Sequence, residues 1–420
     1  MTDNLDVFVD GSPTGQLTRA TDDTITFDYS TDSPDLTPAL SVSMPRSLTH
    51  HRPEVVMPWL DNLLPDNDDV RTRWARAYGL RRVTAYDLLR HVGADCAGAV
   101  QILPTGETPS QSGETIPISQ ADIAAHIRTL RADTTAWDFA RHGGHWSLGG
   151  QQGKFTLVRT SEGAWALPTG RAASTHIVKV GVPGVPDADV AEFVTTRAAA
   201  LLGLPVPEMR YATFGDEVAL LATRFDRYDD GQNVRRLHQE DLCQALGLWR
   251  TMKYQADGGP SAADIVRMMR QVLDPRDRQR GVDAFVKALV FNWITAGTDA
   301  HAKNFALLHL GPRIILAPFY DLISTALLWP ARQVHYEGRL AMKFGGEYRL
   351  RKVDMGRYEQ AGLDLEISPD HLVEVARHYR EHLAEVVRQA LSELPDAVSA
   401  ATRSDMLARI TDRLSGIRVP

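Results

Sequence analysis

The sequence contains little cysteine, no long apolar run and no excess of positive charge. Its 420 residues include only two cysteines, Cys96 and Cys243, and neither has a partner at the spacing of a metal site. We therefore expect a reducing compartment, the cytoplasm. No apolar run is long enough to span a bilayer, so we expect no membrane segment. The acidic start, residues 1–6, has no apolar stretch and does not resemble a secretory signal.

The charge balance limits which partners the chain can bind unaided. Its formal net charge is -7 and its pI is about 6.1. A protein that holds nucleic acid on its own usually presents a basic face to the phosphates. We therefore expect that any contact with DNA depends on a partner protein.

The length and the hydrophobic patterns predict more than one domain and an α+β fold. A single core rarely grows to 420 residues, so two or three domains are expected. We predict domains at 1–110, 111–226 and 227–420, with a linker rich in Thr, Ser, Pro and Gly at 106–118. Strands are predicted early in the chain and at 155–160, 164–167, 176–180, 209–214 and 218–225. Helices are predicted at 53–80, 84–91, 120–130, 188–202, 239–250, 261–272, 277–296, 369–393 and 399–415, so the last domain is mostly α-helical.

Two carboxylates and a carboxamide follow a spacing that phosphotransferases use. Asp299 is followed five residues later by Asn304, and Asp321 comes seventeen residues after that. In protein kinases an Asp orients the attacking hydroxyl, an Asn five residues on binds Mg²⁺, and a later Asp holds the metal under the phosphates. Lys303 could neutralise charge on the phosphoryl group that is transferred.

This spacing alone has a simpler explanation. An Asp followed five residues later by Asn occurs about once by chance in a chain of this length and composition. Asp299 and Asn304 could be turn residues that close the apolar helix 285–294, with Gly297 as its C-terminal cap. Other features of the sequence must decide between the two interpretations.

A glycine-rich segment precedes the catalytic candidates by about 150 residues. It runs from Ser147 to Lys154 and is followed by an apolar strand. Glycines such as Gly149 and Gly150 let backbone amides approach phosphate oxygens closely, and Gln152 adds a polar side chain. The spacing matches neither the usual kinase glycine motif nor the P-loop, so a tight hairpin is an equal alternative.

A strand lysine and a helix glutamate follow in kinase order. Lys179 lies on an apolar strand, where kinases keep the lysine that holds the α- and β-phosphates. Glu192, early in the next helix, is its candidate ion-pair partner. The alternatives are an edge-strand lysine that blocks aggregation and an exposed glutamate in a first helical turn. The joint order of these features, with a short segment at 223–227 between a β-rich and an α-rich half, favours a two-lobed kinase.

Several longer motifs resemble one family. The chain is similar over nearly its whole length to the HipA-like serine/threonine kinase toxins of type II toxin–antitoxin modules. The resemblance is carried by residues 59–67, 224–227, 238–247, 298–305, 317–321 and 341–346.

The resemblance implies a HipA-like fold, in which a small N-terminal α/β subdomain precedes a kinase-like body with an all-α C-terminal lobe. It also implies roles for single residues. Ser147 matches a serine that is autophosphorylated, an event that ejects the loop and inactivates the enzyme. The other implied roles are ATP binding by the glycine-rich loop and Lys179, adenine contacts by the backbone of Thr223 and Phe225, catalysis by Asp299, and Mg²⁺ binding by Asn304 and Asp321. The loop departs from the family pattern at Gly149, Gln151 and Gly153, which makes it more flexible and more polar.

The function implied by the resemblance is that of a Mg-ATP-dependent toxin kinase with a role in persistence. Its substrate would be a translation component, in the class of aminoacyl-tRNA synthetases such as glutamyl-tRNA synthetase. A HipB-like helix-turn-helix antitoxin would neutralise it and make the DNA contact. Two alternatives stay open: a small-molecule phosphotransferase, and a catalytically silent module that only docks an antitoxin.

Overall fold

The computed structural model describes residues 3–31, 33, 37–109, 115–137, 146–168, 172–231 and 234–419. By their contacts, residues group into two compact units, each built from three separate segments. The first unit contains Met1–Val180, Ala212–Arg250 and Ala306–Ile315, and the second contains Gly181–Tyr211, Thr251–Phe305 and Leu316–Pro420. Among the described helices, none is both long enough and apolar enough to cross a bilayer.

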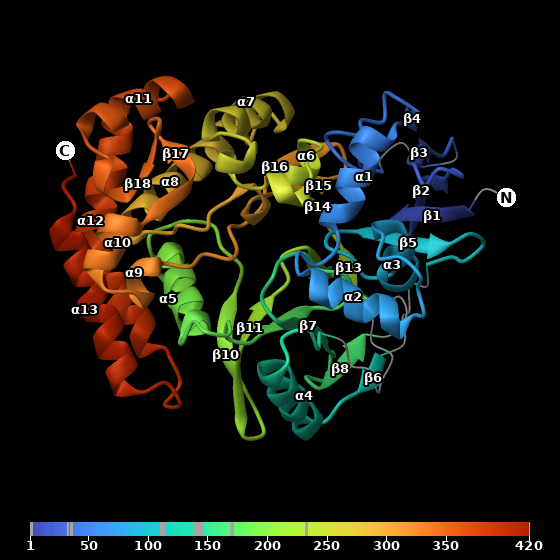
Figure 1. Cartoon of the computed structure of the whole chain (residues 1–420), viewed down its shortest axis with the longest axis horizontal. Helices are drawn as coiled ribbons and strands as arrows, with labels where there is room; N and C mark the ends of the chain where they lie inside the picture. The colour runs from blue at the N-terminus through green and yellow to red at the C-terminus, as the bar shows by residue number, and fades with distance from the viewer. Residues whose placement is uncertain are drawn as a thin grey trace. The chain divides into compact units, whose positions relative to one another are not determined.

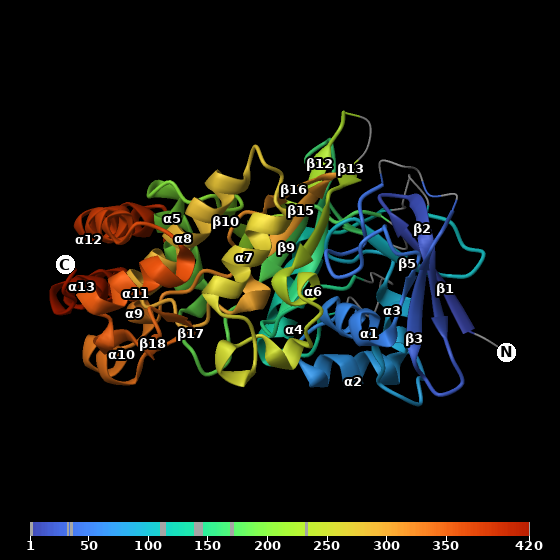
Figure 2. The ribbon, with the colours of Figure 1, turned by 90° about the horizontal axis from the view of Figure 1, so that it is seen from above.

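The first unit begins with a five-stranded antiparallel sheet in the order β4-β3-β2-β1-β5. Its strands are β1 Asp3–Val9, β2 Ser12–Arg19, β3 Ile25–Tyr29, β4 His50–His51 and β5 Val100–Pro104. Helix α1 (Pro53–Asn62) packs on β3 and α3 (Ala85–Val92) packs on β5, with α2 (Asp68–Ala77) between them in the chain (Figure 2). The Thr84 side chain accepts the Asp87 amide and caps α3, as the sequence predicts.

A second sheet of the first unit carries the glycine-rich loop. Its order is β10-β11-β9-β7-β8-β6, and α4 (Gln120–Ala132) packs on β11 (Figure 1). The strands are β6 Thr115–Pro117, β7 Lys154–Arg159, β8 Trp165–Pro168, β9 His176–Lys179, β10 Met209–Phe214 and β11 Glu217–Thr223. The five predicted strands of this region are confirmed to within two residues. Buried side chains of both sheets belong to one hydrophobic core.

The second unit is mainly helical. Its long helix α12 (Pro369–Ser392) packs against α5, α8, α11 and α13 (Figure 1). The helices are α5 Ala188–Leu201, α7 Ala262–Val272, α8 Arg278–Thr295, α9 Thr325–Leu328, α10 Ala331–Glu337, α11 Met355–Leu365 and α13 Ala400–Gly416, joined by a hairpin of β17 Arg339–Phe344 and β18 Glu347–Arg349. The predictions of α5, α7, α8, α12 and α13 are confirmed. Ser261 and Asp264 form a capping box that fixes the start of α7.

The helix predicted at 239–250 is wrong. This segment forms β14 (His238–Asp241), which pairs with β15 (Ala306–Leu310), and then the short helix α6 (Leu242–Ala245). Asp241 and Gln244 form a capping box that supports only one turn of helix. The elements that were not predicted include the hairpin of β12 (Arg227–Asp229) and β13 (Val234–Arg236) and the strand β16 (Arg313–Leu316) beside β15.

Candidate active site

The loop that carries Asp299 starts at the C-terminus of α8. Ala296 adopts the left-handed conformation there with φ 57°, so the sequence expectation that Gly297 supplies the cap is wrong. The Gly297 amide donates to the Asn292 carbonyl at 2.6 Å. A Cβ on residue 297 would lie 2.4 Å from Asn292 Oδ1, so only glycine fits this close approach.

Hydrogen bonds hold Asp299 and Asn304 in one conformation. The Asn304 Nδ2 group donates to the Asp299 carbonyl at 2.8 Å, which closes the loop on itself. The hydroxyl of Tyr254 donates to Asp299 Oδ1. Lys303, in the 3₁₀ turn Ala302–Asn304, is buried. Within the described part of the chain, these two hydrogen bonds use neither the amide oxygen of Asn304 nor the second carboxylate oxygen of Asp299.

Asp321 joins these residues around one small cavity. The Tyr320 hydroxyl donates to the Lys303 carbonyl at 2.7 Å and ties the two segments together. Asp299, Asn304 and Asp321 all line the cavity, together with backbone and side chains of their neighbours. The structure therefore brings together three of the four residues predicted for catalysis and Mg²⁺ binding.

The donor set of this cavity suits magnesium. Mg²⁺ takes oxygen ligands, and proteins usually bind it through one or two carboxylates while phosphates and waters complete the shell. Asp321 and Asn304 offer a carboxylate and an amide oxygen. In the described part of the chain no group of three or more His, Cys, Asp or Glu side chains could hold a metal ion.

The first unit holds the glycine-rich loop against the N-terminal subdomain. Ser147 is fully buried; its amide donates to the Asp95 carbonyl at 2.9 Å and its hydroxyl donates to the Leu63 carbonyl at 2.6 Å. The Gly150 carbonyl accepts the Asp66 amide at 2.9 Å. The loop is therefore fixed by the backbone that connects α1 to α2.

The rest of the loop is closed by its own side chains. The Lys154 ammonium donates to the Gly149 carbonyl at 2.8 Å, and Gln152 Nε2 donates to the Val180 carbonyl at 2.8 Å. Gly150 has φ 96°, a conformation that other residues rarely adopt, and a Cβ there would lie 2.7 Å from Lys154 Nζ. Such a loop is longer than a tight hairpin, because Gly150 belongs to an irregular connection that ends where β7 begins at Lys154.

Lys179 lies on β9, which pairs with β7 on one side and β11 on the other. The interpretation of Lys179 as an edge-strand residue is therefore wrong. Thr223 ends β11 opposite His176, and half-buried Phe225 follows in the turn. Thr223 and Phe225 therefore lie at the start of the connection from β11 to β12.

Glu192 is fully buried on α5, so the interpretation as an exposed glutamate is wrong. It belongs to the second unit and Lys179 to the first. Their ion pair therefore stays a prediction.

Comparison with known proteins places the chain in a family. Residues 146–398 match the HipA-like C-terminal domain, and residues 5–103 match the HipA N-terminal domain. The chain belongs to the HipA family. It is 31% identical to a Sinorhizobium fredii protein named "Putative kinase Y4mE", over 96% of each chain. It is 27% identical to the serine/threonine-protein kinase toxin HipA of Shewanella oneidensis, over 93% of this chain and 91% of the relative.

A solved structure confirms the fold. The chain is similar to a structure of the Shewanella oneidensis HipA, HipB and operator DNA complex, with a TM-score of 0.82 and 24% identity, over 98% of this chain and 96% of that chain. The HipA-like α+β fold predicted from the sequence is confirmed, and the curated relatives confirm the prediction of a kinase-family enzyme.

The HipA-family motif at 224–227 belongs to a buried ionic cluster that sequence reasoning did not assign. Three guanidiniums surround Asp95: Arg227 at 2.9 Å, Arg236 at 3.2 Å and Arg224 at 3.7 Å. Burial alone would raise the pKa of Asp95, but these guanidiniums outweigh burial and lower it. The Asp226 carboxylate forms ion pairs with two of these residues, Arg224 and Arg227, and it accepts a hydrogen bond from the Gly98 amide at 2.7 Å. Charged residues inside an otherwise apolar stretch were the available signal.

Proposed function

We propose that this HipA-family chain is a Mg-ATP-dependent serine/threonine protein kinase. The observation that carries the proposal is the gathering of Asp299, Asn304 and Asp321 around one cavity, held by Tyr254 and Tyr320. Phosphoryl transfer asks little covalent chemistry of a protein and depends on positioning and charge. Hydrogen bonds that fix the loop in advance serve that need.

Each residue has a defined task in the proposed reaction. Asp299 orients the substrate hydroxyl and takes its proton as the hydroxyl oxygen bonds to the γ-phosphorus and the bond to ADP breaks. Asn304 and Asp321 would hold Mg²⁺, which would supply positive charge to the phosphate oxygens. The Lys303 ammonium adds positive charge near the transferred group.

The nucleotide side of the proposal rests on the first unit. Glycine-rich loop residues Ser147 to Lys154 offer backbone amides to the phosphates, and Lys179 on the central strand β9 offers an ammonium. Backbone groups of Thr223 and Phe225 would meet the adenine. The Lys179–Glu192 ion pair would hold the lysine in place, as in other kinases.

We further propose a toxin role with a HipB-like helix-turn-helix antitoxin as partner, in the cytoplasm. A curated relative carries the name of a kinase toxin, and the similar solved structure contains HipA with HipB and operator DNA. The net charge of -7 agrees with a DNA contact made through the partner. The proposed substrate class is a translation component, such as an aminoacyl-tRNA synthetase.

A labelling experiment tests the kinase proposal. Purified protein is incubated with ATP carrying a labelled γ-phosphate, Mg²⁺ and cell lysate, and we expect label on Ser147 or on a lysate protein. Asp299→Asn should lose the label, while Asp405→Asn, which changes an exposed carboxylate on α13, should keep it. Equal label from Asp299→Asn, or none from the unmodified protein, would contradict the proposal.

A further inference from the structure

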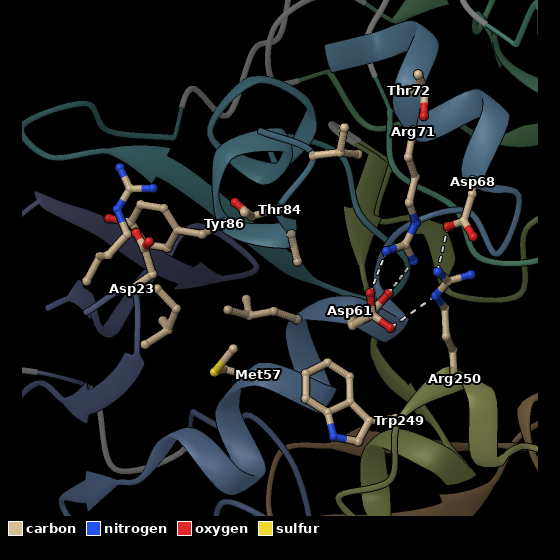
Figure 3. A pocket seen from close by; sticks show the side chains of 15 residues that line it. Asp23, Met57, Asp61, Asp68, Arg71, Thr72, Thr84, Tyr86, Trp249 and Arg250 are labelled. Atoms are coloured by element: carbon tan, nitrogen blue, oxygen red, sulfur yellow. Dashed lines mark hydrogen bonds and ion pairs between the residues drawn. The ribbon is translucent and has the colours of Figure 1, made fainter. Parts of the chain in front are cut away.

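A second cavity lies in the first unit, among α1, α2, α3 and the segment after α6 (Figure 3). Its volume is about 460 Å³, within the range of sites that bind small organic molecules. We propose that this cavity binds an organic cation: a molecule with an aromatic or branched apolar body and one positively charged head. We call it the α1–α2 pocket; it contains none of the residues proposed for catalysis or nucleotide binding.

One part of the α1–α2 pocket is apolar. Its surface is formed by the side chains of Ile25, Met57, Leu60, Val83 and Trp249. Val83 is 49% exposed and Trp249 is 41% exposed, which is high for side chains of this type. Figure 3 shows Met57 and Trp249 beside the open centre of the pocket. This surface suits the apolar body of a ligand.

The three guanidiniums of the pocket are already paired. Arg19 binds Asp3 and Asp87, both at 2.6 Å. Arg71 binds Asp61 and donates to the Pro65 carbonyl at 2.5 Å. An anionic ligand would therefore have to displace ion pairs that the protein makes for itself.

Arg250 is paired even more fully. It binds Asp61 at 3.2 Å and Asp68 at 2.6 Å, and it donates to the Asp66 carbonyl at 2.6 Å (Figure 3). All of its nitrogen atoms are engaged by oxygen acceptors. Within the described ranges, the pocket therefore offers no unpaired guanidinium group to a negatively charged ligand.

Two carboxylates keep an oxygen available. Among the described residues, Asp68 contacts only Arg250 through one oxygen, and its side chain is 76% exposed. Asp23 uses one oxygen for Arg82 and is 43% exposed. The exposed indole of Trp249 adds a π-face that attracts a cation. Charge complementarity therefore favours a positively charged head.

The same residues connect the α1–α2 pocket to the glycine-rich loop. Arg250 holds the Asp66 carbonyl, and the Asp66 amide donates to the Gly150 carbonyl at 2.9 Å. Leu63, in the same connection, accepts the Ser147 hydroxyl. A cation at the available oxygen of Asp68 shares the charge of this carboxylate with Arg250, weakens their ion pair and so loosens the hold of Arg250 on the connection. Occupation of the pocket thus changes how firmly the glycine-rich loop is held. This coupling rests on the proposed function only if it is measured through kinase activity.

Binding is tested by calorimetry with a matched pair of ligands on the full chain. Tryptamine and indole-3-acetate share the indole ring but carry opposite charges. We expect tryptamine to bind once per chain and indole-3-acetate not to bind. Asp68→Asn should weaken the binding of tryptamine about two- to fivefold, as expected for the loss of an exposed ion pair. Asp69→Asn, its exposed neighbour on α2 outside the pocket, should leave binding unchanged.

The coupling is tested by hydrogen exchange of residues 146–154. Tryptamine should speed exchange there in the unmodified chain and in Asp69→Asn, and much less in Asp68→Asn at equal concentration. Neither measurement needs kinase activity, so a failed labelling experiment leaves both interpretable. Equal binding of both ligands, or an affinity that Asp68→Asn does not change, would overturn the binding site; unchanged exchange at saturation would overturn the coupling.

A peptide form of the ligand distinguishes the two possible sources of the cation. N-acetyl-tryptophanyl-lysine amide carries the same indole and ammonium on a peptide backbone. Tighter binding of tryptamine supports a free amine as occupant, and tighter binding of the peptide supports a segment of a protein. Failure of both to bind would overturn the proposal.

Discussion

Asp321 combines a proposed metal ligand with an unfavourable backbone conformation. Its φ is 54°, in the left-handed region that asparagine and aspartate tolerate better than most residues. For an alanine this conformation costs about 1–2 kcal/mol. The carboxylate lines the proposed catalytic cavity despite that cost. Strain at a functional residue is common, because the surrounding structure fixes a side chain where chemistry needs it.

Three substitutions at Asp321 separate backbone strain from chemistry. Asp321→Gly should stabilise the protein or leave it unchanged, Asp321→Asn should be nearly neutral, and Asp321→Ala should destabilise it by about 1 kcal/mol. All three should lower kcat at least about a hundredfold, since a metal ligand is lost. Urea unfolding and kinase assays at saturating Mg²⁺ provide the measurements. If kcat falls only in the variants that lose stability, and not in every variant that lacks the carboxylate, Asp321 has a structural role only.

At the scale of residues, local spacing singled out three residues that line one cavity, but it did not predict the residues that support them. Asp299, Asn304 and Asp321 were visible because they lie within a short stretch and keep a fixed order. Asp95 and Arg224 meet in the fold although 129 positions separate them, as their numbers in the sequence show. No local pattern records such a contact. The sequence analysis singled out Gly297, but for the wrong reason. Glycine is required there because a side chain would collide with Asn292, not because the backbone is left-handed.

Among the elements, the glycine-rich loop depends most on its neighbours. Ser147 is fully buried, and its hydroxyl is satisfied by the Leu63 carbonyl. A phosphate or carboxylate at this position would bring negative charge beside a carbonyl oxygen in a buried site. Buried charge without a partner costs several kcal/mol, far more than a loop of this length can recover.

Ser147→Asp should therefore release the loop. We expect faster hydrogen exchange across residues 146–154 in this variant, whereas Ser147→Ala, which loses one hydrogen bond worth about 1 kcal/mol, should change it little. Ser161→Asp adds the same charge at an exposed turn and serves as the control. Protection that persists in Ser147→Asp would mean that the loop accepts a charge without leaving its site.

Some of the elements that the sequence predicted carry clear signals at their first turns. Helices α7 and α12 have Ser261 and Ser368 before their first turns, and α12 has Pro369 at its first position. The segment 239–250 failed because a four-residue strand runs directly into a capped turn, so apolar residues recur at a helix-like interval. Pairing of β14 with β15, about 70 residues away in the chain, decided its conformation.

At the scale of the whole molecule, the first unit gathers three separate segments of the chain. Glu240 on β14 connects them: it accepts the Ser41 hydroxyl and the Val42 amide, and it binds His309 on β15 at 2.8 Å. His238, two residues before Glu240, donates to the Leu40 carbonyl at 2.9 Å. Residues from all three segments of the first unit therefore meet at one buried site, which contains two histidines.

This site makes the stability of the first unit depend on pH. Burial, and then the neighbouring His309, lower the pKa of His238 from 6.5 to about 3. Below pH 6.5 the unfolded chain takes up a proton at His238 that the folded chain refuses, so stability is lost as pH falls from about 6.5 towards 3. At pH 5 the loss amounts to about 2 kcal/mol.

Urea unfolding at pH 7.5 and pH 5 checks this expectation against His238→Gln. Glutamine keeps a side-chain donor for the Leu40 carbonyl but does not titrate, so its free energy of unfolding should fall by about 2 kcal/mol less between the two pH values. His126, whose pKa burial lowers to about 4, is present in both proteins, and its contribution cancels in the difference. An equal fall in both proteins would mean that His238 is protonated, or accessible to water, in the folded chain.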